Sequence, residues 1–196
     1  MARDEKEVYD GVYDTDDAYA TPHKAKIDYV CDWAERNQSG FQGDILDAGC
    51  GRGEYIRALK DRGLDAYGVE LSTVCCDEYL SDLDHNNLDI LEFCELSMGY
   101  EYSLIYSTDV LEHIPPVELD ATLEAIQNIG RKFLFLVCTG SDVKNGHELH
   151  LSNHTFEEWT VIIEQHFMIT KSIKGFDEWP YIHIFECEKY ETNHNI

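Results

Sequence analysis

Short runs of apolar residues alternate along the chain with longer stretches in which apolar residues recur every three or four positions. The short runs predict buried strands, and the longer stretches predict helices that pack on one side. The expected strands are 44–48, 65–70, 87–90, 102–107, 132–139, 167–174 and 181–188. The expected helices are 22–37, 53–62, 72–83, 116–129 and 155–165, and the last opens with the capping-box sequence Thr155-Phe-Glu-Glu158.

Strands that alternate with helices predict a mostly parallel sheet covered by helices on both faces. The last two strands are separated by a turn that contains Gly175, which predicts an antiparallel hairpin. Residues 1–21 are acidic and rich in tyrosine without a clear period, which predicts a loose N-terminal arm or lid. The sequence therefore predicts a single doubly wound α/β domain over residues 22–196, with ligands bound beyond the carboxyl ends of its strands.

The charge balance narrows the choice of partners. Fifteen Lys and Arg stand against 39 Asp and Glu, which gives a formal net charge of −24 spread along the whole chain. Proteins that bind long nucleic acids neutralise phosphates with Lys and Arg, so this balance argues against nucleic acid. It favours a small or cationic partner, although the charge could also serve solubility alone.

No membrane or secretory segment is expected. The longest apolar run, residues 133–138, has six residues, about a third of the ~20 that a membrane-spanning helix needs. The N-terminus has no apolar stretch of the secretory type. Seven cysteines without a CxxC pair are typical of reduced thiols in a core, so a cytoplasmic location is expected, while the oligomeric state stays open.

A glycine-rich segment carries the clearest chemical signal. Asp47 ends a short apolar run and is followed by glycines at positions 49, 51 and 53. These glycines allow the backbone to turn and to approach a ligand closely, and the next helix directs free N–H groups to the same place. Glu70, at the end of the next strand, can accept hydrogen bonds from both hydroxyls of a ribose. Glu54 stands where a dinucleotide fold has its third glycine and would repel a pyrophosphate, so the pattern favours a phosphate-free nucleoside over NAD.

The motif Leu46-Asp-Ala-Gly-Cys-Gly-Arg-Gly53 resembles the first motif of the Rossmann-like class I S-adenosylmethionine-dependent methyltransferases. The segments Gly68-Val-Glu-Leu-Ser72, Leu88-Asp-Ile90 and Tyr106-Ser-Thr-Asp-Val-Leu-Glu-His-Ile-Pro115 follow in the order of that family. The resemblance implies S-adenosylmethionine as cofactor and a seven-stranded sheet in the order 3-2-1-4-5-7-6 with the last strand antiparallel. Taken alone, the glycine-rich turn could be a structural loop, but Asp47 and Glu70 at their positions favour a ligand site.

The resemblance also assigns cofactor contacts by position. It places the glycine-rich turn around the methionine part with Asp47 close by, Glu70 on the ribose, Leu71 and Ile90 on the adenine, and Asp89 on its amino group. The sulfonium side is lined by the two residues that end the fourth strand. The complete implied set is Asp47, Gly49, Cys50, Gly51, Gly53, Glu70, Leu71, Asp89, Ile90, Ser107 and Thr108.

Histidines are the candidate catalytic residues. The stretch His147-Glu-Leu-His-Leu-Ser-Asn-His154 follows the fifth strand and faces the same edge of the sheet, although it could be surface decoration. We predict His150, and after it His113, as the base that removes a proton from the methyl acceptor. Histidines at the rim favour an oxygen acceptor over a nitrogen acceptor.

The sequence Asp109-Val-Leu-Glu-His113 has two interpretations. In a helical turn, Asp109, Glu112 and His113 would share one face. The favoured interpretation is that Glu112 and His113 pack against nearby loops and that no metal binds. The alternative is a divalent metal site completed by His150, His147 or His154, because the arrangement resembles ubiquinone-pathway O-methyltransferases and plant-type small-RNA 2′-O-methyltransferases. Those groups have Glu where this chain has Asp109.

Aromatic residues are expected to wall the acceptor pocket. The N-terminal arm supplies Tyr9, Tyr13, Tyr19 and His23, and the terminal hairpin supplies Phe176, Trp179 and Tyr181, although Trp179 and Tyr181 could belong to the core. The sequence thus predicts methyl transfer from S-adenosylmethionine to a small molecule. The alternatives are a metal-assisted RNA-end 2′-O-methyltransferase and a non-catalytic accessory protein that binds S-adenosylmethionine.

Overall fold

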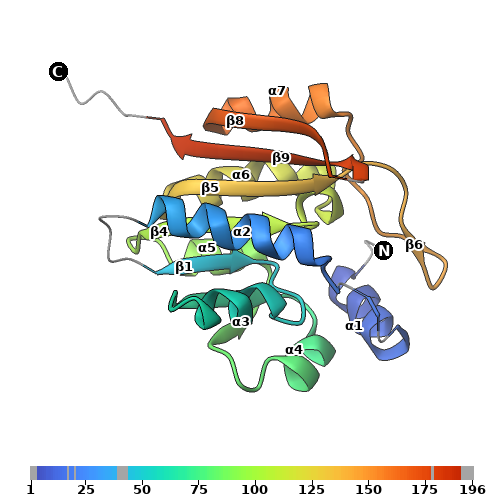
Figure 1. Ribbon diagram of the computed structural model, residues 1–196. Coiled ribbons are helices and arrows are strands. Elements are labelled where there is room, and N and C mark those ends of the chain that lie inside the picture. Colours follow the sequence, from blue (N-terminus) through green and yellow to red (C-terminus); the bar gives the residue numbers. More distant parts are fainter. Residues whose placement is uncertain (1–3, 17, 20, 39–43, 178, 191–196) are drawn as a thin grey trace.

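The computed structural model describes residues 4–16, 18–19, 21–38, 44–177 and 179–190, which form a helix-covered sheet (Figure 1). Its strands are β1 Ile45–Ala48, β2 Ala66–Glu70, β3 His85–Asn87, β4 Tyr102–Thr108, β5 Gly130–Cys138, β8 Phe167–Phe176 and β9 Trp179–Lys189, and a separate ribbon pairs β6 Val143–Lys144 with β7 His147–Glu148. The helices are α1 Glu5–Thr15, α2 Lys24–Asn37, α3 Glu54–Asp61, α4 Thr73–Tyr79, α5 Ile90–Leu96, α6 Pro116–Ile129 and α7 Phe156–His166, with a short 3₁₀ turn η1 at Leu111–His113.

The seven-stranded sheet has the order β3-β2-β1-β4-β5-β9-β8. Strands β1 to β5 run parallel, and β9 lies antiparallel between β5 and β8. Counting the strands of this sheet along the chain gives 3-2-1-4-5-7-6, so the predicted topology is confirmed. The parallel strands end at one edge, and α1 lies beyond that edge, apart from the two helical layers (Figure 1).

The two faces of the sheet build two apolar clusters. Helices α2 and α3 cover one face, and α5, α6 and α7 cover the other (Figure 1). Successive residues of β5 alternate between the clusters. Phe133 and Phe135 belong to the cluster on the side of α5, α6 and α7, and Leu134 belongs to the cluster on the side of α2 and α3. This strict period of two fixes the strand register, because a shift by one residue would turn each apolar side chain to the wrong face. Among the described residues, no helix is long and apolar enough to cross a bilayer.

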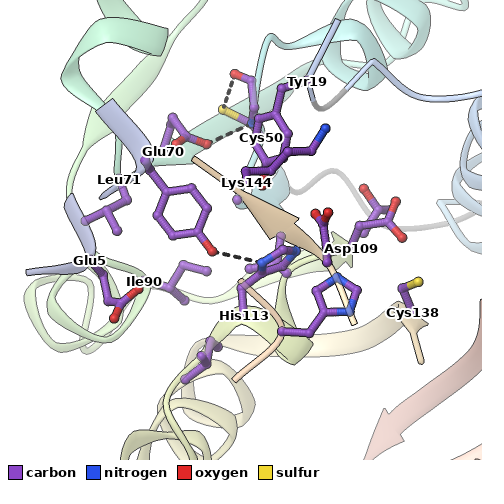
Figure 2. A pocket seen from close by; sticks show the side chains of 18 of the residues that line it. Glu5, Tyr19, Cys50, Glu70, Leu71, Ile90, Asp109, His113, Cys138 and Lys144 are labelled. Atoms are coloured by element: carbon purple, nitrogen blue, oxygen red, sulfur yellow. Dashed lines mark hydrogen bonds between the residues drawn. The ribbon is translucent and has the colours of Figure 1, made fainter. Parts of the chain in front are cut away.

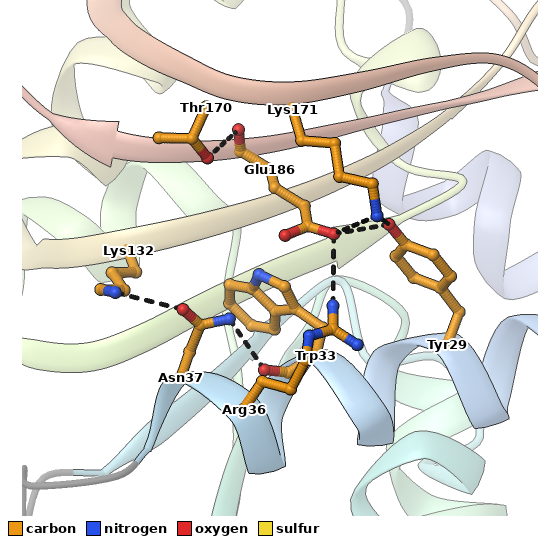
Figure 3. A network of polar contacts seen from close by, with 8 residues as sticks. All are labelled: Tyr29, Trp33, Arg36, Asn37, Lys132, Thr170, Lys171 and Glu186. Carbon is orange, nitrogen blue, oxygen red and sulfur yellow. Dashed lines mark hydrogen bonds and ion pairs between the residues drawn. The ribbon is translucent and has the colours of Figure 1, made fainter.

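A polar network ties α2 to the terminal hairpin (Figure 3). One carboxylate oxygen of Glu186 on β9 accepts hydrogen bonds from the Tyr29 hydroxyl at 2.6 Å, from Arg36 at 3.3 Å and from Lys171 on β8 at 3.1 Å. These bonds join the first helix of the predicted methyltransferase domain to its last strand. On the α2 side of the sheet, these bonds therefore connect residues about 150 positions apart in the chain.

Three local predictions are corrected. Residues 5–15 form helix α1 rather than a loose arm; Asp4 caps it and only Val12 and Tyr13 are buried, so no apolar period is visible. The strand predicted over 87–90 ends at Asn87, because Asp89 caps helix α5, which the sequence analysis missed. Gly175 lies within β8, and the hairpin turns after Phe176. Residues 1–3, 17 and 20 of the predicted arm lie outside the described residues.

Three carboxyl groups are buried near the carboxyl ends of the strands. Asp47 and Glu112 have no exposed surface, and Glu70 is 7 % exposed. Burial raises the pKa of Asp47 and of Glu112 well above the usual range, and it raises the pKa of Glu70 although hydrogen bonds from backbone N–H groups oppose it. Each charged carboxylate therefore carries a folding penalty that is absent below the unfolded pKa and complete above the folded pKa.

We expect the free energy of unfolding to rise as the pH falls from the raised folded pKa values of these carboxyl groups toward the unfolded values of about 4, because the folded chain then binds protons that the unfolded chain has lost. Each unit by which folding raises a carboxyl pKa contributes about 1.4 kcal/mol to this dependence. Urea unfolding at several pH values measures the dependence. Asp47→Asn should flatten it, and Asp61→Asn, an exposed control, should not. A stability that declines steadily on acidification over this interval would contradict the prediction.

Candidate functional site

A cavity of about 1070 Å³ opens at the carboxyl edge of the sheet. Its walls come from α1, from the turn after β1, from the end of β2 and from the loops after β4 and β5 (Figure 2). Pockets for single ligands in proteins span about 300–1,000 Å³, so this cavity has room for a cofactor together with a second small molecule.

The glycine-rich turn after β1 forms one end of the cavity. Gly49 and Gly51 have φ angles of 87° and 51°, in the left-handed region that favours glycine. A Cβ added to Gly49 would lie 2.4 Å from a methyl carbon of Val110, so the turn can come this close to the loop after β4 only with glycine. Gly53 precedes α3 without a side-chain cap, which leaves the first N–H groups of α3 directed toward the turn.

Glu70 holds this turn against the start of α4. Its Oε2 accepts a hydrogen bond from the Gly51 N–H at 3.0 Å, and its Oε1 accepts one from the Ser72 N–H at 2.9 Å. The carboxylate is buried and keeps further lone pairs for hydroxyl donors of a ligand. Its place beside the glycine turn fits the ribose of a nucleoside cofactor.

Most of the predicted cofactor residues meet at this cavity. Those that line it are Gly49, Cys50, Gly51, Glu70, Leu71, Asp89, Ile90 and Thr108. Asp47, Gly53 and Ser107 do not belong to the lining; Asp47 is fully buried beside the Tyr106 hydroxyl, and Ser107 is 1 % exposed. The Oδ1 of Asp89 caps α5 by accepting a hydrogen bond from the Leu91 N–H at 2.8 Å, which leaves Oδ2 for a ligand.

The acceptor half begins where β4 ends. Asp109 has a φ of 54°, an unusual value for a residue other than glycine, and strain of this kind clusters at functional sites. Its Oδ2 forms an ion pair with Lys26 at 2.5 Å, while its Oδ1 is buried without a hydrogen-bond partner. Lys26 was missed in the sequence analysis, because nothing local marks a lysine on an amphipathic helix as the partner of a residue 83 positions away.

Glu112 is buried behind the cavity wall. Its Oε1 accepts a hydrogen bond from the Cys138 N–H at 2.8 Å, which ties the loop after β4 to the end of β5. Its Oε2 has no hydrogen-bond partner. Glu112, His113 and His150 each bring one possible ligand atom within 4.8 Å of the other two. Asp109, the fourth residue of the predicted alternative metal set, is not in this group, because η1 begins after it and Lys26 holds its carboxylate.

Both predicted catalytic histidines line the cavity, with ring centroids 4.7 Å apart and planes nearly perpendicular. The Nδ1 of His150 lies 2.7 Å from the Gly140 carbonyl, and the Nδ1 of His113 lies 3.1 Å from the Leu149 carbonyl. A carbonyl oxygen only accepts hydrogen bonds, so the Nδ1 of His150 carries the hydrogen in the neutral ring. The Nε2 of His150 therefore keeps its lone pair, which can accept a proton.

Only some of the aromatic residues predicted to wall the acceptor pocket line the cavity. Tyr19 and Tyr181 line the cavity, and burial together with nearby carboxylates raises the pKa of Tyr19. The structure does not bring His23 and Trp179 to the lining; their rings pack edge to face at 4.5 Å, outside it. His23 instead caps α2, accepting a hydrogen bond from the Ala25 N–H.

The lysines in the lining are engaged by the protein itself. Lys6 donates a hydrogen bond to Asn87, Lys26 pairs with Asp109, and Lys144 pairs with Asp16 at 2.9 Å. The described lining also contains eight carboxylic acids, Asp4, Glu5, Glu54, Glu70, Asp89, Asp109, Glu118 and Asp142. The cavity is thus strongly negative, which suits a ligand that carries a positive centre.

The fold is shared with solved methyltransferases. Magnesium protoporphyrin IX methyltransferase from Synechocystis PCC 6803, solved with bound SAM, has a TM-score of 0.71 at 17% identity over 96% of this chain and 99% of that chain. A S-adenosylmethionine-dependent methyltransferase from Clostridium acetobutylicum gives 0.68 at 14% identity over 95% and 99%. The 1,6-didemethyltoxoflavin-N1-methyltransferase from Burkholderia thailandensis, solved with its substrate and S-adenosylhomocysteine, gives 0.66 at 15% over 96% and 91%. No curated protein sequence matches the chain significantly.

A family model described as a methyltransferase domain matches residues 23–193, which is most of the chain. The match covers the sheet, the glycine-rich turn and the loops that carry His113 and His150. The chain therefore belongs to the methyltransferase-domain family and has the Rossmann-like fold of the class I S-adenosylmethionine-dependent methyltransferases.

Proposed function

We propose that this enzyme transfers a methyl group from S-adenosylmethionine to an oxygen atom of a small molecule. The observation that carries the proposal is the pair of hydrogen bonds from the Gly51 and Ser72 N–H groups to the buried Glu70 carboxylate. They fix a ribose acceptor beside a glycine turn in which Gly49 has no room for a side chain. Of the structural neighbours, one was solved with bound SAM and another with S-adenosylhomocysteine.

The chain's residues divide the cavity between the two reactants. Glu70 accepts hydrogen bonds from the ribose hydroxyls, and Leu71 and Ile90 pack on the adenine, while Asp89 accepts a hydrogen bond from its amino group. The glycine turn and the end of β4 surround the methionine part. When bound, S-adenosylmethionine supplies a methyl group on a positively charged sulfur, and the negative lining favours that charge.

The histidines supply the base. His150 has its Nδ1 hydrogen held by the Gly140 carbonyl, so its Nε2 is oriented to take a proton from an acceptor hydroxyl. His113, whose Nδ1 also lies close to a backbone carbonyl, is the second candidate. Alignment of the acceptor oxygen with the methyl carbon at about 3 Å supplies most of the remaining rate enhancement.

A small acceptor is supported by the shape and charge of the cavity. Helix α1 contributes Glu5, Lys6, Tyr9 and Tyr13 to the lining, so the site lies under a helix rather than in an open groove. Within the described lining, the lysines are engaged by protein groups and offer no basic track for RNA phosphates. All seven cysteines are free thiols, which fits the cytoplasmic location that we propose.

We also propose that the reaction needs no metal. Asp109 pairs with Lys26, and Glu112 gives one oxygen to the Cys138 N–H, so a compact carboxylate pair of the kind that Mg²⁺ prefers is not assembled. The remaining group of Glu112, His113 and His150 suits proton transfer between two oriented imidazoles and a buried carboxyl.

Replacing Glu70 tests the cofactor site. We expect Glu70→Ala to weaken S-adenosylmethionine and S-adenosylhomocysteine binding about 100-fold, because the charged acceptor of the ribose hydroxyls and the anchor of the turn are both lost. Isothermal titration calorimetry measures the affinities, and thermal unfolding reports whether the variant folds. The exposed Glu164→Ala should bind normally. Unchanged affinity in a folded Glu70→Ala protein, or no binding by the wild type, would refute the cofactor proposal.

Replacing His150 tests the base. With an acceptor found by screening, His150→Gln should lower kcat about 100-fold or more, because general-base catalysis contributes about 10²–10⁴. S-adenosylhomocysteine affinity should not change. His147→Gln, an exposed histidine of the same stretch, is the matched control. Near wild-type kcat at saturating acceptor would exclude His150 as the base, and cofactor binding without turnover on any acceptor would favour the accessory-protein alternative.

Chelation tests the metal-free proposal. Dialysis against EDTA should change neither S-adenosylhomocysteine affinity nor turnover, and adding Mg²⁺ or Mn²⁺ should restore nothing, because Asp109 is paired with Lys26 and does not form a carboxylate pair with Glu112. Elemental analysis of the purified protein accompanies the assay. Loss of turnover on chelation with recovery on metal addition would instead support the metal-assisted alternative, with ligands in the group of Glu112, His113 and His150.

A further inference from the structure

Helix α1 bridges the two halves of the cavity through two adjacent residues. The Tyr9 hydroxyl lies 2.8 Å from the Nδ1 of His113, and the two rings meet edge to face. Asp10 points to the other half, where its Oδ1 accepts hydrogen bonds from the Ser72 hydroxyl at 2.7 Å and from the Val74 N–H at 3.2 Å. One helix thus contacts both the candidate base and the residue next to the ribose acceptor.

Ser72 joins Asp10 to Glu70. Its N–H donates to the Glu70 carboxylate at 2.9 Å, and its hydroxyl donates to Asp10. A ligand that holds the Glu70 carboxylate in place therefore also holds Ser72, the residue on which α1 docks. A cofactor ribose bound to Glu70 would order both ends of this short chain of hydrogen bonds.

The attachment of α1 is mainly polar. Only Val12 and Tyr13 of the helix are buried, and its other anchors are hydrogen bonds and ion pairs to the rim of the cavity. At its far end, Asp16 pairs with Lys144, and Asn145 of the same ribbon donates to Thr15 and to the Gly11 carbonyl. Each such contact contributes about 1 kcal/mol, so the docked position of α1 can be shifted by a modest binding energy.

The His113 ring depends on α1 for its surroundings. Its Nδ1 contacts both the Leu149 carbonyl and the Tyr9 hydroxyl, so undocking of α1 would remove one of these two polar contacts. A hydrogen bond to the second nitrogen of an imidazole sets its orientation and basicity, and loss of such a partner typically costs about 10–100-fold in function at metal sites, where this has been measured.

We propose that α1 couples cofactor binding to the orientation of His113, with Tyr9 as the positioning residue and Asp10 as the docking residue. The inference rests on the proposed function, since the coupling ligand is S-adenosylmethionine or its demethylated product. Cofactor bound beside Glu70 stabilises the position of Ser72. Helix α1 then docks on Ser72 through Asp10, and Tyr9 holds the His113 imidazole toward the acceptor. By linkage, the docked helix in turn tightens the cofactor.

Hydrogen exchange of the full chain measures docking. S-adenosylhomocysteine should slow amide exchange in residues 5–15 about tenfold, within the usual range of coupling. Asp10→Ala should abolish this protection and weaken S-adenosylhomocysteine about tenfold. Asp14→Ala, an exposed position of the same helix, makes the same change in charge and helix propensity and should behave as the wild type.

The histidine resonances measure positioning. In the S-adenosylhomocysteine complex of protein labelled with ¹⁵N-histidine, Tyr9→Phe should shift the ring signals of His113 and leave those of His147 unchanged. Asp10→Ala, which contacts Ser72 and Val74 rather than His113, should shift the same signals through the undocked helix. Asp14→Ala and the remote Tyr190→Phe should shift neither.

Three outcomes separate the claims. Calorimetry without S-adenosylhomocysteine binding would overturn the proposed function, and with it this inference. Binding that leaves exchange of α1 unchanged, or speeds it, would overturn the inference alone. His113 signals that respond to Tyr9→Phe but not to Asp10→Ala would show a local contact without coupling, which also refutes the proposal.

Discussion

The arrangement of the cavity depends on the buried carboxylate of Glu70. It joins the turn after β1 to the start of α4, two segments that the parallel sheet brings to the same edge but that share no regular hydrogen bonding. Burial alone disfavours its charge, and the N–H groups of Gly51 and Ser72 compensate for part of that cost. The glycines at 49 and 51 then follow from geometry, because the turn must bend back to meet the carboxylate.

The sequence was sufficient where the determining physics is local or periodic. The alternation of apolar residues in β5, the capping box at Thr155 and the proline at the start of α6 each act within a few residues, and these elements were predicted closely. Helix α1 was not predicted, because its only two buried residues, Val12 and Tyr13, are adjacent and produce no helical period. Helix α5 escaped because Asp89 was read as a ligand contact and not as a cap.

The candidate site was predictable on the cofactor side and less so on the acceptor side. Glu70 and the glycine turn lie at fixed positions relative to consecutive strands, so topology alone brings them together. The acceptor side depends on contacts between distant segments, such as Lys26 with Asp109 and Tyr9 with His113, 83 and 104 positions apart. His23 and Trp179 show the converse. Both were predicted to line the acceptor pocket, but their rings pack against each other outside the cavity lining.

The distance between surface residues and the cavity has a practical consequence. Asp4, Glu5 and Lys6 line the cavity, so a label attached to any of them would alter the site itself. Tyr190, by contrast, hydrogen-bonds the Glu164 carbonyl on α7 and takes no part in the lining. Fluorescent labels and immobilisation chemistry are therefore better placed on the exposed side of α7 near Glu164, where they leave the lining unchanged.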